Sequence, residues 1–422
     1  MTDVLDPLLD STFKGYPQGA APLPRSRVGE QGWNVLAGDL PLPLAVIRRD
    51  ALAHNVGWMQ RFADDAQVDF APHGKTTMSP QLFRRQLDAG AWGLTFATVT
   101  QMQAGLAAGA RNILIANQVL DAADLGAIAA LHDTHPDVRV IFLLDSLEQL
   151  ALIEAVSVDR PFEVLLEVGV AGGRTGVRGH DDAVALARRA HASGAVTLAG
   201  LECYEGLGNT GRSEDDRPAA AGLMDRVERL GIQCSTEGLF GADEVIVSAG
   251  GSGVFDLVVP RLRLALARPV AGLLRSGCYV SHDHGHYQRL VHAVNQRLGC
   301  SDAQGLRAAL EVWALVQSMP EPGLAILALG KRDISYDLGM PVPLATCARA
   351  SRELKAVPEG WAIQKLNDQH AYLRLTSDSN GLRVGDRVCL GISHPCTTFD
   401  KWRWMPIVDE DYTVVDAIVT CF

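Results

Sequence analysis

The 422-residue sequence lacks the features that would direct it out of a reducing, aqueous compartment. Its first residues show no basic segment followed by an apolar core, so we expect no secretory signal. No apolar run approaches the ~20 residues of a membrane span. The eight cysteines are dispersed without a CxxC pair, which in a long chain favours reduced thiols over a disulfide framework. We therefore predict a cytoplasmic protein without a membrane partner.

The sequence is also short of positive charge. It has 38 Lys and Arg residues against 49 Asp and Glu residues, for a net charge of −11. This balance argues against nucleic acid or an anionic membrane surface as a partner. The hydrophobic content of 47% and the charged content of 21% are typical of a soluble globular protein. The length allows one large domain and a smaller one.

No GxGxxG motif follows the early strand-like runs, which disfavours a dinucleotide-binding fold. Instead, apolar runs alternate with helical patterns, at 43–47, 68–71, 93–97, 112–116, 138–144, 162–168, 196–203, 244–249 and 255–260. Such alternation indicates a parallel sheet, either doubly wound or closed into a barrel. Nine runs exceed the eight strands of a (β/α)8 barrel by one. We assign 43–47 to a neighbouring domain, which leaves the barrel strands within 68–260.

The pattern changes after about residue 290. Strand-like runs begin at 310, 323, 371, 387 and 412, separated by the turn sequences "PEPG", "SDSNG" and "VGD". We therefore predict an α/β fold with a (β/α)8 TIM-type barrel at 48–285 and a mainly antiparallel β domain at 286–422. The N-terminal segment 1–47 is expected to pack with the β domain.

Lys75, in the stretch "FAPHGKTTMSP", is the first candidate for chemistry. A lysine in a loop is usually a solvated charge. However, Lys75 lies four residues beyond Ala71, at the strand ends where barrels place their active sites. A lysine partly desolvated there has a lowered pKa and can capture a carbonyl group. His73 in the same loop either orients a bound ligand or simply packs and forms hydrogen bonds.

The loop "SAGGSGVF", Ser248 to Phe255, follows the seventh barrel run. Its small residues let backbone N–H groups approach an anion, and this loop holds a phosphate in many barrels. A plain turn is the alternative. A carbonyl-capturing lysine combined with a phosphate site indicates pyridoxal 5′-phosphate.

Two further loops carry residues with open interpretations. Arg174, in "VGVAGGRTGV", is either a surface arginine or a cation near the cofactor ring or the substrate carboxylate. Tyr204, in "ECYEG", is either a rim residue or a cofactor contact.

His394 and Cys396, in "GISHPCTTFDKW", are the candidate metal ligands. Residues at i and i+2 of an extended segment point to the same face, and a thiolate with an imidazole favours zinc. With two protein ligands, such a zinc would keep positions open, as catalytic zinc does. The rival candidate is "SHDHGHYQRLVH", where His282, His284 and His286 would share one side of a strand, unless the segment is a hydrogen-bonded hinge.

Several of these stretches together resemble a known family. "LAVIRRDALAHNVGWMQ", "FAPHGKTTMSPQLFRRQLDAGAWGLTFAT", "GGRTGV", "SAGGSG", "RSGCYVSHDHGHY" and "SHPC" are similar to the D-serine dehydratase and D-threonine aldolase group. These are fold-type III pyridoxal-phosphate enzymes, built like alanine racemase. The resemblance spans nearly the whole chain and implies a barrel, a β domain and a homodimer with the active site at its interface.

The resemblance also implies roles for individual residues. Lys75 would be the Schiff-base lysine, and His394 and Cys396 match the zinc pair of the dehydratase branch. The aldolase branch has an aspartate in the second metal position and uses a harder divalent ion. The other cofactor-binding residues that we predict are His73, Arg174, Tyr204, Tyr279 and, at the phosphate, Ser248, Gly250, Gly251 and Ser252.

These assignments predict a dehydratase that depends on pyridoxal phosphate and zinc. The substrate would be a D-β-hydroxy amino acid (D-serine, D-threonine or D-3-hydroxyaspartate), converted to a 2-oxo acid and ammonia. Lys75 would remove the Cα proton, and zinc would assist departure of the β-hydroxyl. The alternatives are a D-threonine aldolase and a non-catalytic cofactor carrier, although a carrier needs no Lewis acid. A racemase needs a second base, and the sequence does not place Tyr279 or Tyr336 opposite the lysine.

Overall fold

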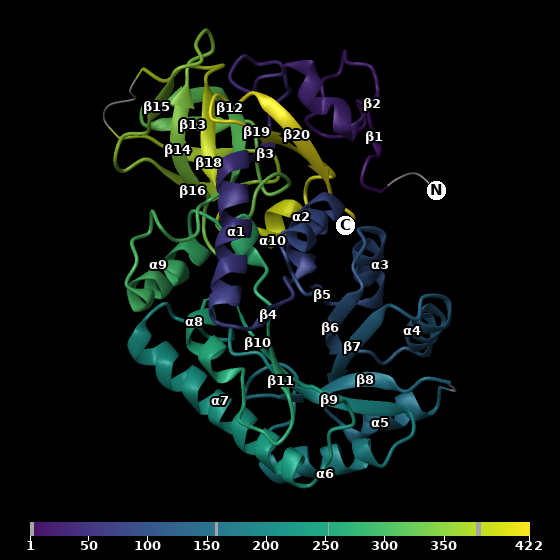
Figure 1. Cartoon of the computed structure of the whole chain (residues 1–422). Coiled ribbons are helices and arrows are strands. Elements are labelled where there is room, and N and C mark those ends of the chain that lie inside the picture. The colour runs from purple at the N-terminus through teal and green to yellow at the C-terminus, as the bar shows by residue number, and fades with distance from the viewer. Residues whose placement is uncertain (1–3, 157–158, 252, 377–380) are drawn as a thin grey trace.

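The computed structural model describes residues 4–156, 159–251, 253–376 and 381–422, which form a parallel barrel and an antiparallel β domain (Figure 1). The barrel strands are β4 (Asp69–Phe70), β5 (Leu94–Phe96), β6 (Asn112–Gln118), β7 (Arg139–Leu144), β8 (Phe162–Val168), β9 (Val196–Cys203), β10 (Val245–Ala249) and β11 (Val270–Leu274). They form one 8-stranded sheet in the order β4-β11-β10-β9-β8-β7-β6-β5. A parallel bridge between His73 and Thr95 joins its two ends. The predicted fold class is confirmed.

Helices cover the outside of this sheet and connect successive strands. They are α1 (Arg49–Asp65), α2 (Pro80–Asp88), α3 (Val99–Ala107), α4 (Ala122–Thr134), α5 (Leu147–Glu154), α6 (His180–His191) and α7 (Ser213–Thr236). At the start of α2, the Ser79 hydroxyl accepts a hydrogen bond from the Leu82 amide, and Pro80 occupies the first turn. The barrel interior is filled by small and aliphatic side chains, namely Ala71, Leu114, Ile141, Leu143, Leu165, Ala199, Ile246 and Leu273. It is therefore a packed core with its active end at the strand C-termini.

The run 255–260, predicted as the last barrel strand, is not a strand. It forms the short helix α8 (Phe255–Val258) and a 3-10 turn, Val259–Arg261. The eighth strand is β11, which lies further along the chain. Phe255 and Val258 are both buried, as residues three apart on one helical face can be. A short apolar run fits a buried helical turn as well as a strand.

The β domain contains β12 (Leu310–Glu321), β13 (Leu324–Leu327), β14 (Val342–Cys347), β15 (Leu354–Ala356), β16 (Ala362–Leu366), β17 (Ala371–Arg374), β18 (Arg387–Gly391), β19 (Trp404–Val408) and β20 (Val414–Val419). The long strand β12 pairs with β13, β18 and β3 (Leu44–Arg48), all antiparallel. The run 43–47 thus belongs to this sheet, through β3. The hairpin β1 (Leu8–Leu9) and β2 (Leu23–Pro24) precedes it. Of the predicted turn "SDSNG", residues 377–380 lie outside the described part of the chain.

The β domain lies over the end of the barrel that carries the lysine loop. The short helix α10 (Cys396–Phe399) contacts the 3-10 helix Gly74–Thr76, and α9 (His286–Leu298) follows β11 at the junction (Figure 1). Within the described ranges, no helix is long and apolar enough to cross a membrane. The two candidate sites, which come from distant parts of the sequence, therefore meet at one junction.

Candidate active site

A cavity of about 220 Å³ lies where the barrel loops meet the β domain. Lys75, Arg174 and Tyr204 line it from the barrel, and His394 and Cys396 line it from the β domain. Its other lining residues are His73, Thr76, Ala97, Ala116, Asn117, Leu143, Glu167, Glu202, Gly250, Gly251, Arg275, Gly277 and Cys278. The structure thus brings the predicted lysine and the predicted metal pair to one space.

Lys75 lies in a 3-10 helix whose shape depends on glycine. A Cβ on Gly74 would lie 2.5 Å from the Phe96 ring and 3.0 Å from the Phe83 ring, so only glycine lets the loop pack this closely. Burial lowers the pKa of Lys75, Arg174 adds to that effect, and Cys396 opposes it. Burial and nearby charges, with no hydrogen bond to a described residue, account for this lowered pKa. A lysine in this state gives up its proton more readily than a solvated one.

His73 also faces the cavity. Its Nδ1 atom is buried and has no hydrogen-bond partner among the described residues. Burial and the nearby Lys75 lower the pKa of His73 well below its usual value. A neutral imidazole with an unused ring nitrogen is suited to contact a bound molecule, since an unsatisfied buried polar atom is costly.

Arg275, which the sequence reasoning did not single out, lies at the end of β11 on the cavity wall. It forms a buried ion pair with Glu202 and donates hydrogen bonds to the Ser248 hydroxyl (2.7 Å) and to the Cys203 carbonyl (3.0 Å). Burial raises the pKa of Glu202 to about 8, although Arg275 acts in the opposite direction. The Ser248 side chain is thus bound within the wall, because its hydroxyl also donates to the Leu273 carbonyl, and it does not line the cavity.

The predicted phosphate loop holds a buried carboxylate. The Gly250 amide donates to Glu205 Oε2 at 3.1 Å, and the Gly251 amide donates to Glu205 Oε1. Gly250 has a φ of +126°, and a Cβ there would lie 2.4 Å from the Leu274 side chain. Ser252, also predicted at the phosphate, lies outside the described residues.

Of the remaining cofactor candidates, two face the cavity and one does not. The Arg174 guanidinium carbon lies 4.3 Å from the centre of the Tyr204 ring, a cation–π contact that fixes both side chains at the rim. Tyr279 is 1% exposed, accepts a hydrogen bond from Gln86 at 2.9 Å and does not line the cavity. It packs against Phe70 in the core beneath the lysine loop.

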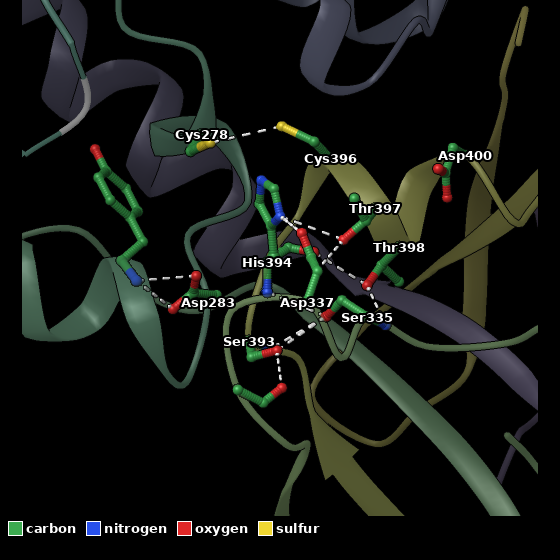
Figure 2. Close-up of polar contacts among 12 residues, drawn as sticks. Cys278, Asp283, Ser335, Asp337, Ser393, His394, Cys396, Thr397, Thr398 and Asp400 are labelled. Atoms are coloured by element: carbon green, nitrogen blue, oxygen red, sulfur yellow. Dashed lines mark hydrogen bonds and ion pairs between the residues drawn. The ribbon is translucent and has the colours of Figure 1, made fainter. Parts of the chain in front are cut away.

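Figure 2 shows how the metal candidates lie. His394 Nδ1 is 2.6 Å from Asp337 Oδ2, so Nδ1–H donates to the carboxylate and Nε2 is the ring nitrogen that could bind a metal. The contacts with Cys396 and Asp337 raise the pKa of His394 to about 9, although burial opposes them. The Cys396 Sγ lies 3.8 Å from the Cys278 Sγ and 3.6 Å from the Thr76 hydroxyl. The contact with Cys278 lowers the pKa of Cys396 well below its usual value, and His394 adds to the effect.

The rival metal candidate is wrong, because its segment is not a strand. His282 has a φ of +52°, and His286 begins helix α9. Burial lowers the pKa values of His282 and His284 to about 4. The Asp283 carboxylate accepts the amides of Gly285, Tyr287 and Gln288, at 2.8 to 3.1 Å. Over the described ranges, no group of three or more His, Cys, Asp or Glu side chains could hold a metal ion. The pair His394 and Cys396 therefore stays a prediction as the metal site.

Comparisons with known proteins fit this geometry. The family described as "Alanine racemase, N-terminal domain" matches residues 47–269, just over half of the chain. The chain belongs to this family of fold-type III pyridoxal-phosphate enzymes. The family described as "Putative serine dehydratase domain" matches residues 309–408, most of the β domain.

The similar proteins are named for two different activities, aldol cleavage and dehydration. The D-threonine aldolase of Arthrobacter sp. is 26% identical over 84% of this chain and 86% of its own. The D-threo-3-hydroxyaspartate dehydratase of Delftia sp. (strain HT23) is 27% identical over 85% of this chain and 92% of its own. The crystal structure of D-threonine aldolase from Filomicrobium marinum covers 92% of this chain and 97% of its own, with a TM-score of 0.76 and 23% identity. At 23% sequence identity, this structural similarity establishes a shared fold and nothing about activity.

Proposed function

We propose that the protein is a lyase that depends on pyridoxal phosphate and zinc and dehydrates a D-β-hydroxy amino acid to a 2-oxo acid and ammonia. The observation that carries the proposal is the shared cavity of Lys75, His394 and Cys396. A soft thiolate beside an imidazole favours zinc over a harder ion. Solved structures of a D-threo-3-hydroxyaspartate dehydratase include a histidine-to-alanine variant and, two positions on, a cysteine-to-alanine variant in metal-free form.

The residues present fit both groups. For the cofactor, Lys75 offers an unpaired amine, His73 an orphaned ring nitrogen, and the Gly250–Gly251 segment a wall with no side chain. For the metal, His394 is oriented by Asp337 through Nδ1, in the carboxylate–histidine arrangement that supports bound metals, and Cys396 lies beside it. When bound, the cofactor withdraws electrons from Cα, and zinc polarises the β-hydroxyl as a Lewis acid.

The side chains of this chain then perform the following roles. Lys75 binds the cofactor and, once released, removes the Cα proton, which its lowered pKa favours. His394 and Cys396, from the β domain, would hold the metal, which would supply a Lewis acid for the β-hydroxyl. Arg174, at the rim, offers a cation for the substrate carboxylate.

A second candidate is aldol cleavage, which the names of two relatives favour. An aldolase would use the same lysine and metal to break the Cα–Cβ bond of D-threonine, giving glycine and acetaldehyde. The cysteine at position 396 supports dehydration, because the aldolase branch has an aspartate there.

D-Threonine separates the two activities in one assay. Dehydration yields 2-oxobutanoate and ammonia, whereas aldol cleavage yields glycine and acetaldehyde. We expect 2-oxobutanoate from D-threonine and pyruvate from D-serine, both lost after chelation and restored by zinc. Glycine as the only product would overturn the dehydratase proposal in favour of the aldolase. If the protein holds the cofactor but no metal and forms neither set of products, the result would favour the non-catalytic cofactor carrier.

A further inference from the structure

The loop that follows β10 is packed directly onto the loop that follows β9. A Cβ on Gly251 would lie 2.9 Å from Gly206 Cα and 3.1 Å from the Tyr204 ring. Between these loops lies the Glu205 side chain, which is 7% exposed. Its two carboxylate oxygens accept the amides of Gly250 and Gly251, one each. A buried carboxylate is stable only with such partners, so this contact fixes the shape of the Gly-rich loop.

The position of the cavity shows on which side of the loop Glu205 lies. Gly250, Gly251 and Tyr204 line the cavity, whereas Glu205 does not. The two amides therefore point away from the space where a cofactor would bind. Glu205 is thus placed as a brace behind the loop. A carboxylate occupying the phosphate position itself would face the cavity.

We propose that Glu205 is a positioning residue for cofactor binding, which braces the Gly250–Gly251 segment from behind and so sets the affinity for the phosphate group. This inference rests on the proposed use of pyridoxal phosphate. Because two backbone donors need two acceptors, glutamine at 205 would replace one acceptor with an amino group that faces an N–H. The loop would then lose its fixed shape, and the phosphate would have to order it at a cost in affinity.

The test compares two probes that differ only in the phosphate. Metal-replete apoprotein is titrated with pyridoxal 5′-phosphate and with pyridoxal, for the wild type, Glu205→Gln and the exposed control Glu353→Gln. In Glu205→Gln we expect the Kd for pyridoxal 5′-phosphate to rise about tenfold to a hundredfold, the range for losing a hydrogen bond to a charged group. The Kd for pyridoxal should change by less than about threefold, and Glu353→Gln should resemble the wild type. Tighter binding of pyridoxal 5′-phosphate by Glu205→Gln would mean that the wild-type carboxylate occupies the phosphate position, which would overturn the proposal. An equal loss of affinity for both probes would also overturn it.

Hydrogen exchange gives a readout that needs no variant and no bound cofactor. In the wild-type apoprotein, the amides of Gly250 and Gly251 should exchange slowly, because both are bonded to a buried carboxylate. Exchange as fast as that of an open loop would overturn the proposal even if Glu205→Gln does not fold. A wild-type protein that protects these amides but binds no pyridoxal 5′-phosphate would overturn the proposed function, and the Glu205 contact would then remain without a role in cofactor binding.

Discussion

Lys75 is the residue whose replacement tests the assignment of the cavity most directly. Lys75→Ala removes the only lysine that lines the cavity within the described residues, so borohydride should no longer attach the cofactor to the protein. Activity should fall by about 10²-fold to 10⁴-fold, the range for a lost general base. Peptide mass analysis after reduction should find the cofactor on Lys75 in the wild type and in the exposed control Lys355→Ala. A reduced adduct on another lysine would contradict the assignment.

Cys396 is the residue that decides which metal the site prefers. Cys396→Asp replaces a soft thiolate with a hard carboxylate, so zinc affinity should fall while manganese or magnesium should bind better. Metal competition followed by elemental analysis measures this preference, and the exposed Cys421→Ser variant, whose side chain does not line the cavity, serves as the control. An unchanged preference for zinc would show that Cys396 is not a ligand. Products from D-threonine in this variant would also show whether residue 396 selects the reaction.

His394 should make metal binding depend on pH. Its pKa is raised to about 9, so at neutral pH the imidazole is protonated and must lose a proton before it binds zinc. Apparent zinc affinity should therefore rise about tenfold per pH unit from pH 6.5 toward 9. Asp337→Asn removes one cause of the raised pKa and the orienting carboxylate, which should weaken binding about tenfold to a hundredfold and flatten the slope. A slope of zero in the wild type would contradict this role of His394.

At the scale of elements, the 3-10 helix that carries Lys75 depends on close packing at Gly74. Gly74→Ala would insert a methyl group against Phe96 and Phe83, which should destabilise the protein by about 1–3 kcal/mol, the usual cost of overpacking. Gly126→Ala, in α4 with open space around it, should instead stabilise by about 0.5–1 kcal/mol. Urea unfolding of both variants checks the opposite signs. A neutral Gly74→Ala would mean that the loop relaxes without strain.

Helices and strands could be predicted from the sequence where an apolar run had the length of a strand and was bounded by helical patterns. The runs that became β6 to β10 are apolar and bounded by helices, and Ser79 followed by Pro80, a helix-start pattern, coincides with the start of α2. The eighth strand was missed, because the apolar run at 255–260 precedes it and satisfies the same pattern. The decision between helix and strand there depends on tertiary packing that no local pattern contains.

Site residues could be predicted only where a short segment contained the reactive or metal-binding side chains together. Lys75 and the His394–Cys396 pair each lie within a few residues, whereas the positions of Arg275, Glu205 and Cys278 have meaning only through partners far away in sequence. The histidine cluster shows the reverse error. Its alternation would place three rings on one face only if the segment were extended, and His282 is in the left-handed region.

At the scale of the whole molecule, the site depends on both domains at once. The lysine comes from the barrel and the metal pair from the β domain, and the two are joined by the contact between Cys396 and Thr76. Strand β3, from the N-terminal segment, pairs with β12 and β19 in the β domain before the chain enters the barrel. The β domain is therefore built from segments that precede and follow the barrel in the sequence. These two connections hold the domains in the relative position that a shared cavity requires.

A second copy of the chain is the partner expected for this molecule, and its surface allows a test. Tyr336, Leu338 and Met340 are 42%, 44% and 43% exposed in the loop that also carries Asp337, the partner of His394. Such a group of apolar side chains beside a site is typical of an interface. We expect a dimer in sedimentation, and Leu338→Glu with Met340→Glu should shift it toward monomer and lower activity. Val384→Glu, at a 60% exposed position elsewhere, should leave the dimer intact, and a fully active wild-type monomer would contradict the prediction.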